Sequence, residues 1–387
     1  MDARADQTLD VDPLPLAQAL IRCPSLTPAE AGALDVLERA LQALGFRTRR
    51  YPFGAVDNLY ARLGEAAPNL CFAGHVDVVP VGDAAAWSVD PFAADVRDGW
   101  LMGRGAADMK AAIAAMVAAV ESYLASNGRP KGSISFLITT DEEGPALEGT
   151  KKVLPMIAAA GEKLDHCLVG EPTSVLRVAD TLKNGRRGSL NARIAVRGVQ
   201  GHVAYPDEAK NPVPALLDLL AALRARKLDD GAPGFQPSNL EVTSIDVGNA
   251  AHNVIAVEAQ AKLNIRFNTA HDGIDLVRWI ESEADKIRKA AGVHIETQIA
   301  VTGAAFYTDP CAFTDMVCAA AEEITGAPPN LSTSGGTSDA RFIKDYCPVA
   351  ELGLQNATAH KVDERVRVED VRALAKIYAG VLRRYFA

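Results

Sequence analysis

The sequence lacks the marks of several large protein classes. It has no excess of positive charge, since 40 Lys and Arg residues stand against 49 Asp and Glu for a formal net charge of −9. The basic footprint of a nucleic-acid-binding protein is therefore absent. The longest apolar run, 111–120, is about half of the roughly 20 residues that cross a bilayer. The first ten residues have neither the basic start nor the apolar run of a secretory signal. We expect no nucleic-acid partner and no membrane partner.

Cysteine is sparse and unpaired in the sequence. The chain has six cysteines and no CxxC pair, and we found neither an internal repeat nor a low-complexity tract. In a chain of this length, scattered cysteines are typical of free thiols in a reducing compartment. We therefore expect a cytoplasmic protein. The six positions are Cys23, Cys71, Cys167, Cys311, Cys318 and Cys347.

The composition is that of a folded protein with a full core. Of the 387 residues, 48% are hydrophobic and 23% are charged, an ordinary balance for a globular chain. At roughly 150 residues per domain, this length predicts two to three domains.

The first part of the chain alternates strand and helix patterns, which favours an α/β domain. Strands are predicted at 69–73, 133–139 and 166–170, and helices at 34–44 and 109–124. The closing part returns to this alternation and ends in a helix at 368–385. We therefore expect a mixed sheet flanked by helices, formed from 1–184 and 301–387.

The middle of the chain has a different order of elements. Its patterns predict strand, helix, strand, strand, helix and strand, and 258–268 alternates polar and apolar residues without a break, as in a sheet with one wet face. This order is a split βαβ, ferredoxin-like unit. We expect an inserted α+β domain at 185–300. The predicted segments are 190–199, 213–226, 240–247, 254–268, 274–290 and 293–301.

Residues of metal-ligand type follow several predicted strands. Catalytic groups in open α/β sheets gather at the carboxyl ends of strands, so these positions can converge. Several carboxylates in one cleft would hold protons unless cations are present. His and carboxylate ligands suit two catalytic zinc ions, with open positions for water and substrate. The residues are His75, Asp77, Asp108, Asp141, Glu142, Glu143, Glu171 and His360.

Each fragment taken alone has an ordinary structural alternative. A histidine on a strand is often a structural residue, and Asp108 could be the N-cap of the helix that follows it. The acidic run 141–143 could be a solvated turn. The spacing of these residues alone therefore leaves a metal site open.

Longer strings resemble one known family in order along nearly the whole chain. The sequence is similar to the di-zinc aminoacylase and carboxypeptidase family of metallohydrolases. The matching strings are GHVDVVP (74–80), WSVDPFAADVRDGWLMGRGAADMKAAIAAM (87–116), TTDEEGPA (139–146) and GEPT (170–173). Further strings resemble the branch of this family that acts on an N-succinylated diamino acid. These are KNGRRGS (183–189), RGVQGHVAYP (197–206), KNP (210–212), SGGTSDARF (334–342) and NATAHKVDERV (356–366).

The resemblance implies a role for each matching residue. His75 and Glu171 would hold one Zn²⁺, Glu143 and His360 the other, and Asp108 would bridge them, with Co²⁺ able to substitute. Asp77 would support His75, and Glu142 would be the general base. His202 would stabilise the oxyanion, reaching the active site of the partner subunit in a homodimer through the inserted dimerisation domain. Substrate contacts are implied for Arg186, Ser189, Tyr205, Asn253, Arg266, Gly336 and Thr337. The spacing does not decide which of Arg186 and Arg187 faces the substrate.

The function implied by the resemblance is hydrolysis of the succinyl amide of an N-succinylated diamino acid. Two other interpretations stay open. One is a related N-acyl-amino-acid deacylase, such as an acetylornithine deacetylase, or a carboxypeptidase. The more distant one is a non-catalytic relative in which metal only holds the fold.

Overall fold

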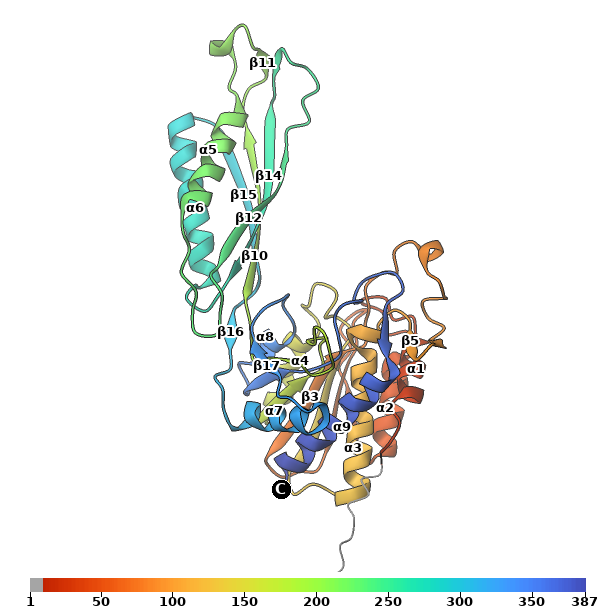
Figure 1. Cartoon of the computed structure of the whole chain (residues 1–387). Helices are drawn as coiled ribbons and strands as arrows, with labels where there is room; N and C mark the ends of the chain where they lie inside the picture. Colours follow the sequence, from red (N-terminus) through yellow and green to blue (C-terminus); the bar gives the residue numbers. More distant parts are fainter. Residues whose placement is uncertain (1–9) are drawn as a thin grey trace, which may run out of the picture. The chain divides into compact units, whose positions relative to one another are not determined.

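The structure, a computed structural model, describes residues 10–387, and they divide into two compact units (Figure 1). The first unit contains the described residues up to Asn184 together with Thr308–Ser332 and Ser338–Ala387. The second contains Gly185–Tyr307 and Thr333–Thr337. Each unit has its own hydrophobic core. The second unit thus takes in 301–307 and 333–337, which were expected in the closing part of the chain.

A mixed eight-stranded sheet forms the first unit. β3 lies between β6 and β7 and runs parallel to both, whereas β1, β2 and β6 pair antiparallel in turn. Every residue of β3 and β6 is buried, as expected for strands covered on both faces. In spatial order the strands are β1 (Arg47–Arg50), β2 (Asn58–Leu63), β6 (Ser133–Thr139), β3 (Asn69–His75), β7 (His166–Val169), β18 (Val349–Glu351), β8 (Thr181–Lys183) and β17 (Asn330–Ser332).

Helices and a small sheet complete this unit. The helices are α1 (Leu14–Ile21), α2 (Ala33–Ala43), α3 (Ala111–Asn127), α4 (Thr150–Ala159), α7 (Ala312–Thr325), α8 (Ala340–Ile343) and α9 (Val368–Tyr385), with the short turns η1 (Ala84–Ala86) and η2 (Ala106–Lys110). The small sheet has the order β19 (Arg365–Arg367), β5 (Trp100–Met102) and β4 (Val96–Arg97). α3 packs against α1 and α9, and α9 also packs against α7 (Figure 1).

α3 is the most deeply buried helix segment of this core. The whole of 111–120 is buried. By length and composition, 106–127 is also apolar enough to cross a membrane, but 72% of its most apolar window is buried inside the fold. We therefore interpret it as a core helix. It begins at Ala111 and not at the predicted Met109, whose φ of −132° and ψ of 27° are not helical.

Phe72 on β3 joins the sheet to α9. Its ring lies 5.5 Å from that of Phe136 and 5.6 Å from that of Tyr378, and its exposed fraction is 0%. We expect Phe72→Ala to lower the free energy of unfolding by about 3–5 kcal/mol, because it leaves a cavity among rings that cannot collapse fully. Urea denaturation followed by circular dichroism measures this loss. The exposed Val96→Ala should stay within about 0.5 kcal/mol of the parent. A similarly small loss for Phe72→Ala would contradict this view of the core.

The second unit is a ferredoxin-like fold, as its order of elements predicted. Its elements are β10 (Gly188–Arg197), α5 (Pro212–Ala225), β12 (Asn239–Asp246), β14 (Glu258–Phe267), α6 (Gly273–Ala291) and β15 (His294–Gly303). The strands pair antiparallel in the order β12-β14-β10-β15. α5 and α6 lie side by side on one face of the sheet (Figure 1). The side chains of β10 and β14 alternate between buried and more exposed, which leaves the other face open.

Shorter elements lie at the two ends of this sheet. β9 (Gly185–Arg186) pairs with β16 (Phe306–Tyr307) where β10 begins. Beyond the end of β10, β11 (Gly201–His202) pairs with β13 (Val254–Ile255), next to the turn η3 (Pro206–Glu208). The strand predicted at 254–268 is therefore two strands, because its first two residues pair with β11 and not with β10.

Candidate active site

Three neighbouring parallel strands bring ligand-type residues to one edge of the first sheet. β3 ends at His75, the acidic run 141–143 follows β6, and Glu171 follows β7. Because β3 pairs in parallel with both other strands, their carboxyl ends meet at the same edge. His75 Nε2 accordingly lies 3.7 Å from Glu171 Oε1.

Asp108 reaches this edge from the loop between β5 and α3. Its φ of −126° and ψ of 96° are not helical. Gly105 precedes it with a φ of +85°, and a Cβ there would come within 2.7 Å of Val78 Cγ1, so the turn requires glycine. The N-cap of α3 is Lys110. The alternative that Asp108 caps this helix is therefore wrong.

The carboxylate of Asp108 lies between two imidazoles. Its Oδ1 is 3.1 Å from His75 Nε2, and its Oδ2 is 3.1 Å from His360 Nε2. His360 Nε2 also lies 2.8 Å from Glu143 Oε1. One carboxylate thus faces two imidazoles, each with a second carboxylate beside it. This is the donor arrangement of two adjacent cation sites that share one bridging ligand.

Asp141 and Asp77 organise the acidic loop. Asp141 Oδ2 accepts hydrogen bonds from the main-chain N–H groups of Leu147 and Glu148, both at 2.8 Å, so Asp141 has a structural role. The Asp77 carboxylate accepts the main-chain N–H of Glu143 at 3.1 Å. His75 Nδ1 lies 2.9 Å from the main-chain oxygen of Asp77 and 3.5 Å from its Oδ1. Asp77 therefore contacts both His75 and the acidic loop.

The two histidines attract protons strongly. Burial lowers the pKa of His75, but hydrogen bonds with carboxylates outweigh it and leave that pKa well above its usual value. Hydrogen bonds to Asp108 and Glu143 raise the pKa of His360 to about 10. Burial raises the pKa of Asp108, but its hydrogen bonds with both histidines hold that pKa below its usual value. The pocket thus favours positive charge beside Asp108.

The charged forms of two glutamates in the site, Glu142 and Glu171, are disfavoured. Burial, with neighbouring carboxylates, raises the pKa of Glu142 to about 8 and that of Glu171 well above its usual value. Glu171 Oε1 is buried without a hydrogen-bond partner among the described residues. A cation at this point would satisfy that oxygen and favour both charged forms.

The residues present fit a metal centre. In the described part of the chain, three groups have ligand atoms that all lie within 4.8 Å of one another: His75, Glu142 and Glu143; His75, Asp108 and Glu171; and Asp108, Glu143 and His360. Imidazole and carboxylate donors of this kind suit zinc and similar divalent metals. Every predicted ligand therefore belongs to at least one of these groups.

The predicted substrate residues all belong to the second unit, where they form two separate clusters. Arg186, Ser189, Arg266 and the loop 333–337 lie where β10 begins: Ser189 pairs with Arg266 across β10 and β14, and Arg186 Nη1 donates to the carbonyl of Gly336 at 3.1 Å. Thr337 lies in the same loop. We name these five residues the anchor cluster: Arg186, Ser189, Arg266, Gly336 and Thr337.

The second cluster lies at the opposite end of the sheet. His202 is in β11, Asn253 immediately precedes β13, and the main-chain N–H of Val203 donates to the carbonyl of Asn253. The rings of His202 and Tyr205 are 5.8 Å apart, and Tyr205 is 61% exposed. We name His202, Tyr205 and Asn253 the tip cluster.

Sequence reasoning missed several buried charged residues around the metal-type ligands. Glu364, Arg104 and Lys110 are 0–2% exposed, and Asp339 is 5% exposed, with its Oδ1 3.9 Å from Arg341 Nη2. Each lies within a string quoted above for the resemblance. The local sequence carries no signal for their burial, since Glu364 stands between Asp363 and Arg365 and Arg104 stands between two glycines.

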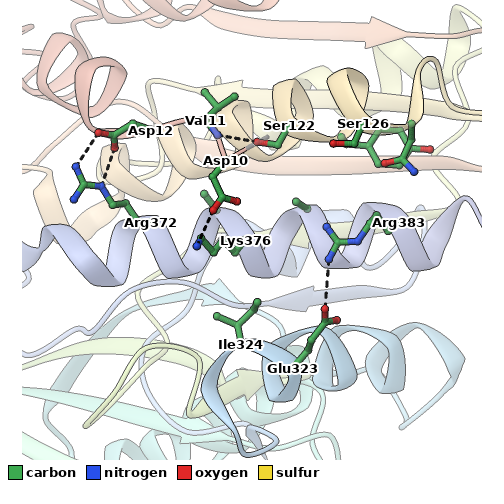
Figure 2. A pocket seen from close by; sticks show the side chains of 14 residues that line it. Asp10, Val11, Asp12, Ser122, Ser126, Glu323, Ile324, Arg372, Lys376 and Arg383 are labelled. Carbon is green, nitrogen blue, oxygen red and sulfur yellow. Dashed lines mark hydrogen bonds and ion pairs between the residues drawn. The ribbon is translucent and has the colours of Figure 1, made fainter. Parts of the chain in front are cut away.

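A large pocket of about 600 Å³ lies elsewhere on the first unit, between α3, α7, α9 and the segment at Asp10 (Figure 2). Its charged groups are already paired: Arg372 with Asp12, Lys376 with Asp10, and Arg383 with Glu323. None of the predicted site residues lines it. We assign no function to this pocket.

Proteins of similar sequence share one name. A succinyl-diaminopimelate desuccinylase from Caulobacter vibrioides (strain ATCC 19089 / CIP 103742 / CB 15) is 59% identical over 387 residues, which span 100% of this chain and 99% of that protein. One from Maricaulis maris (strain MCS10) is 61% identical over 375 residues, spanning 97% of this chain and 96% of that protein.

Solved structures of low sequence identity share the fold. Aminopeptidase PepT from Bacillus cereus superposes with a TM-score of 0.79 at 20% identity, covering 96% of this chain and 97% of that one. The YXEP protein of Bacillus subtilis, described as a dinuclear metal binding peptidase, gives 0.71 at 16% identity, covering 97% of each chain.

The family assignment rests on most of the chain. Residues 71–384 match the model of peptidase family M20/M25/M40. This range includes every predicted ligand and both clusters of the second unit. The chain therefore belongs to peptidase family M20/M25/M40.

Proposed function

We propose that the protein is a zinc-dependent hydrolase that cleaves the succinyl amide of N-succinyl-LL-2,6-diaminopimelate, releasing succinate and LL-2,6-diaminopimelate in bacterial lysine and diaminopimelate biosynthesis. One observation carries the reaction class: Asp108 lies between His75 and His360, with Glu142 beside them. The substrate comes from the name of the relatives that are 59% and 61% identical over nearly their whole length.

Five residues would hold two Zn²⁺ ions, for which Co²⁺ can substitute. His75 and Glu171 would bind one ion, Glu143 and His360 the other, and Asp108 both. When bound, the metal supplies positive charge that polarises the amide carbonyl and makes a water molecule more acidic.

Glu142 is the proposed general base. Its carboxylate lies within 4.8 Å of ligand atoms of His75 and Glu143, yet the ligand set does not require it. It would take a proton from the attacking water and pass it to the leaving amine, so one carboxylate serves both halves of the reaction. Asp77 would position this base, since its carboxylate accepts the main-chain N–H groups of Glu142 at 3.4 Å and Glu143 at 3.1 Å.

The anchor cluster offers the groups that an anionic acyl chain needs. A guanidinium suits bidentate binding of a carboxylate. Ser189 pairs with Arg266 across two strands, and Arg186 contacts the loop that contains Gly336 and Thr337. We infer that this cluster binds the free carboxylate of the succinyl group. Arg186 Nη1 donates to the carbonyl of Gly336 within this cluster, whereas Arg187 Nη1 donates to Asn239 at 2.9 Å, so we infer that Arg186 is the arginine for the substrate.

The tip cluster is proposed to serve the active site of a second copy of the chain. Nine residue steps of β10 at roughly 3.3 Å each, about 30 Å, separate the anchor cluster from the strand end nearest His202. One small substrate cannot touch both ends of this sheet. His202, Tyr205 and Asn253 are exposed in the single chain. In a homodimer, the partner's His202 would stabilise the oxyanion, and the exposed tip cluster would then have a role in catalysis.

The cysteines support a cytoplasmic setting for this activity. All six are free thiols, and Cys71, Cys167 and Cys347 are buried. Free thiols persist where the compartment is reducing.

A substrate comparison on the zinc-loaded protein tests the proposal. We expect a kcat/KM for N-succinyl-LL-2,6-diaminopimelate on the order of 10³-fold above that for N-acetylornithine, because the acetyl compound lacks the carboxylate that the anchor arginines would bind. Removal of metal by a chelator should abolish turnover, and Zn²⁺ should restore it. Preference for the acetyl compound would overturn the substrate and keep the hydrolase. Activity that survives chelation would overturn the metal mechanism.

A further inference from the structure

The carboxylate of Glu364 is surrounded by donors from the loop that carries Asp108. Its Oε1 accepts the main-chain N–H groups of Ala107 at 2.8 Å and Asp108 at 3.1 Å. Its Oε2 accepts the main-chain N–H of Gly105 at 3.1 Å and Arg104 Nη1 at 2.7 Å. The side chain is 0% exposed. Three of the four donors therefore belong to the main chain of 105–108, whose conformation sets the direction of the Asp108 side chain.

Arg104 connects this loop to two others. Its Nη1 also donates to the carbonyl of Lys361 at 3.3 Å, one residue after His360. Its Nη2 donates to the carbonyl of Pro80 at 3.3 Å, at the end of the segment that carries His75 and Asp77. The guanidinium is only 2% exposed. One buried arginine thus joins the three loops that deliver both imidazoles and the carboxylate between them.

The loop that carries His360 is held by further hydrogen bonds. The main-chain N–H of Gly103 donates to the carbonyl of Glu364 at 2.9 Å. One residue before Glu364, the carboxylate of Asp363 accepts the main-chain N–H of Ser88 at 2.8 Å. The backbone at His360 has a φ of +62°, which an L-residue holds only where its surroundings impose it. The contacts at Lys361, Asp363 and Glu364 therefore restrain the loop that carries His360.

We propose that Glu364, paired with Arg104, is a positioning residue of the metal centre, which holds Asp108 and His360 at the separation that two bound ions require. This assignment rests on the proposed metal centre. Glu364 touches neither substrate nor metal, and acts through the loops it joins. A carboxylate suits this place because both of its oxygens accept, whereas an amide would turn an NH₂ group toward main-chain N–H groups or toward Arg104.

The test is a metal titration of full-length Glu364→Gln. The chelated protein is titrated with Zn²⁺ against a chromophoric chelator, and the visible spectrum of the Co²⁺ form is recorded. We expect metal affinity to fall about 10–100-fold, the usual cost of removing a residue that orients ligands. The Co²⁺ spectrum should shift, and kcat should fall more than KM changes. These readouts respond to ligand geometry and not to stability alone.

Glu162→Gln is the matched control. Glu162 is a partly buried carboxylate of the first unit, paired with Arg62 and with the hydroxyl of Tyr60, and none of the described contacts links it to the ligand loops. The Glu162→Gln variant should have a lower melting temperature and the same metal affinity as the parent. If Glu364→Gln does not fold, Arg104→Gln with Glu364→Gln removes both buried charges together and is titrated in its place.

The outcomes are distinct. Metal affinity within threefold of the parent, with an unchanged Co²⁺ spectrum in the folded variant, would overturn the assignment. A parent that binds metal but cleaves no succinyl amide would overturn the proposed function, and the titration would still decide the role of Glu364. A parent that binds neither Zn²⁺ nor Co²⁺ would overturn both.

Discussion

Glu142→Gln is expected to lower kcat by about 10³–10⁴-fold while KM stays close to that of the parent, because proton transfer by a placed carboxylate contributes gains of this order. The amide fills the same space but cannot take the proton of the attacking water. Glu142 is not needed to complete either group of ligands around Asp108, so both ions should remain bound. Steady-state kinetics with the succinyl substrate and metal analysis of the dialysed variant measure the two effects.

Glu148→Gln provides the control for this change. Glu148 lies in the loop that follows the same strand as Glu142. Its side chain is 44% exposed and paired with Lys152. Its kcat should match that of the parent. A Glu142→Gln enzyme that retains more than about a tenth of the parent kcat would remove Glu142 as the base, since a general base contributes at least about 10²-fold. Loss of metal together with activity would make Glu142 a ligand.

His202→Ala is expected to lower kcat by about 10²–10³-fold, the usual effect of removing one donor to an oxyanion. If the partner's His202 completes each site, a mixture of inactive Glu142→Gln and inactive His202→Ala chains should regain activity. Random exchange of subunits in an equal mixture leaves about a quarter of all sites intact, because half of the dimers are hybrids with one complete site. Activity is followed after the subunits are mixed and allowed to exchange.

Two controls make this experiment decisive. His252→Ala changes an exposed histidine beside the tip cluster to which no role is assigned, and it should retain parent activity. Native mass spectrometry with one chain isotopically labelled shows whether hybrids form. Hybrids without regained activity would mean that His202 acts within its own chain or has no catalytic role. A monomer with full activity would contradict the dimeric site altogether.

Local sequence patterns are enough to predict the fold class and the edge of the sheet at which ligand-type residues meet. The strand and helix periodicities follow from local side-chain patterns, and the order β10, α5, β12, β14, α6, β15 predicts a ferredoxin-like unit, which the antiparallel order β12-β14-β10-β15 confirms. His75 ends β3 and Glu171 lies two residues after the parallel strand β7, so topology places them together. Asp108 and His360 do not follow those strands, and the resemblance supplied their roles.

The burial of charged residues and their contacts, in contrast, follow from the tertiary structure. Asp141 and Glu142 are neighbours in sequence, yet the first accepts main-chain N–H groups of its own loop and the second faces His75. Glu364 meets the main-chain N–H of Asp108 across 256 residues of sequence. No local pattern encodes such a contact, because its energy depends on a partner that folding alone brings near.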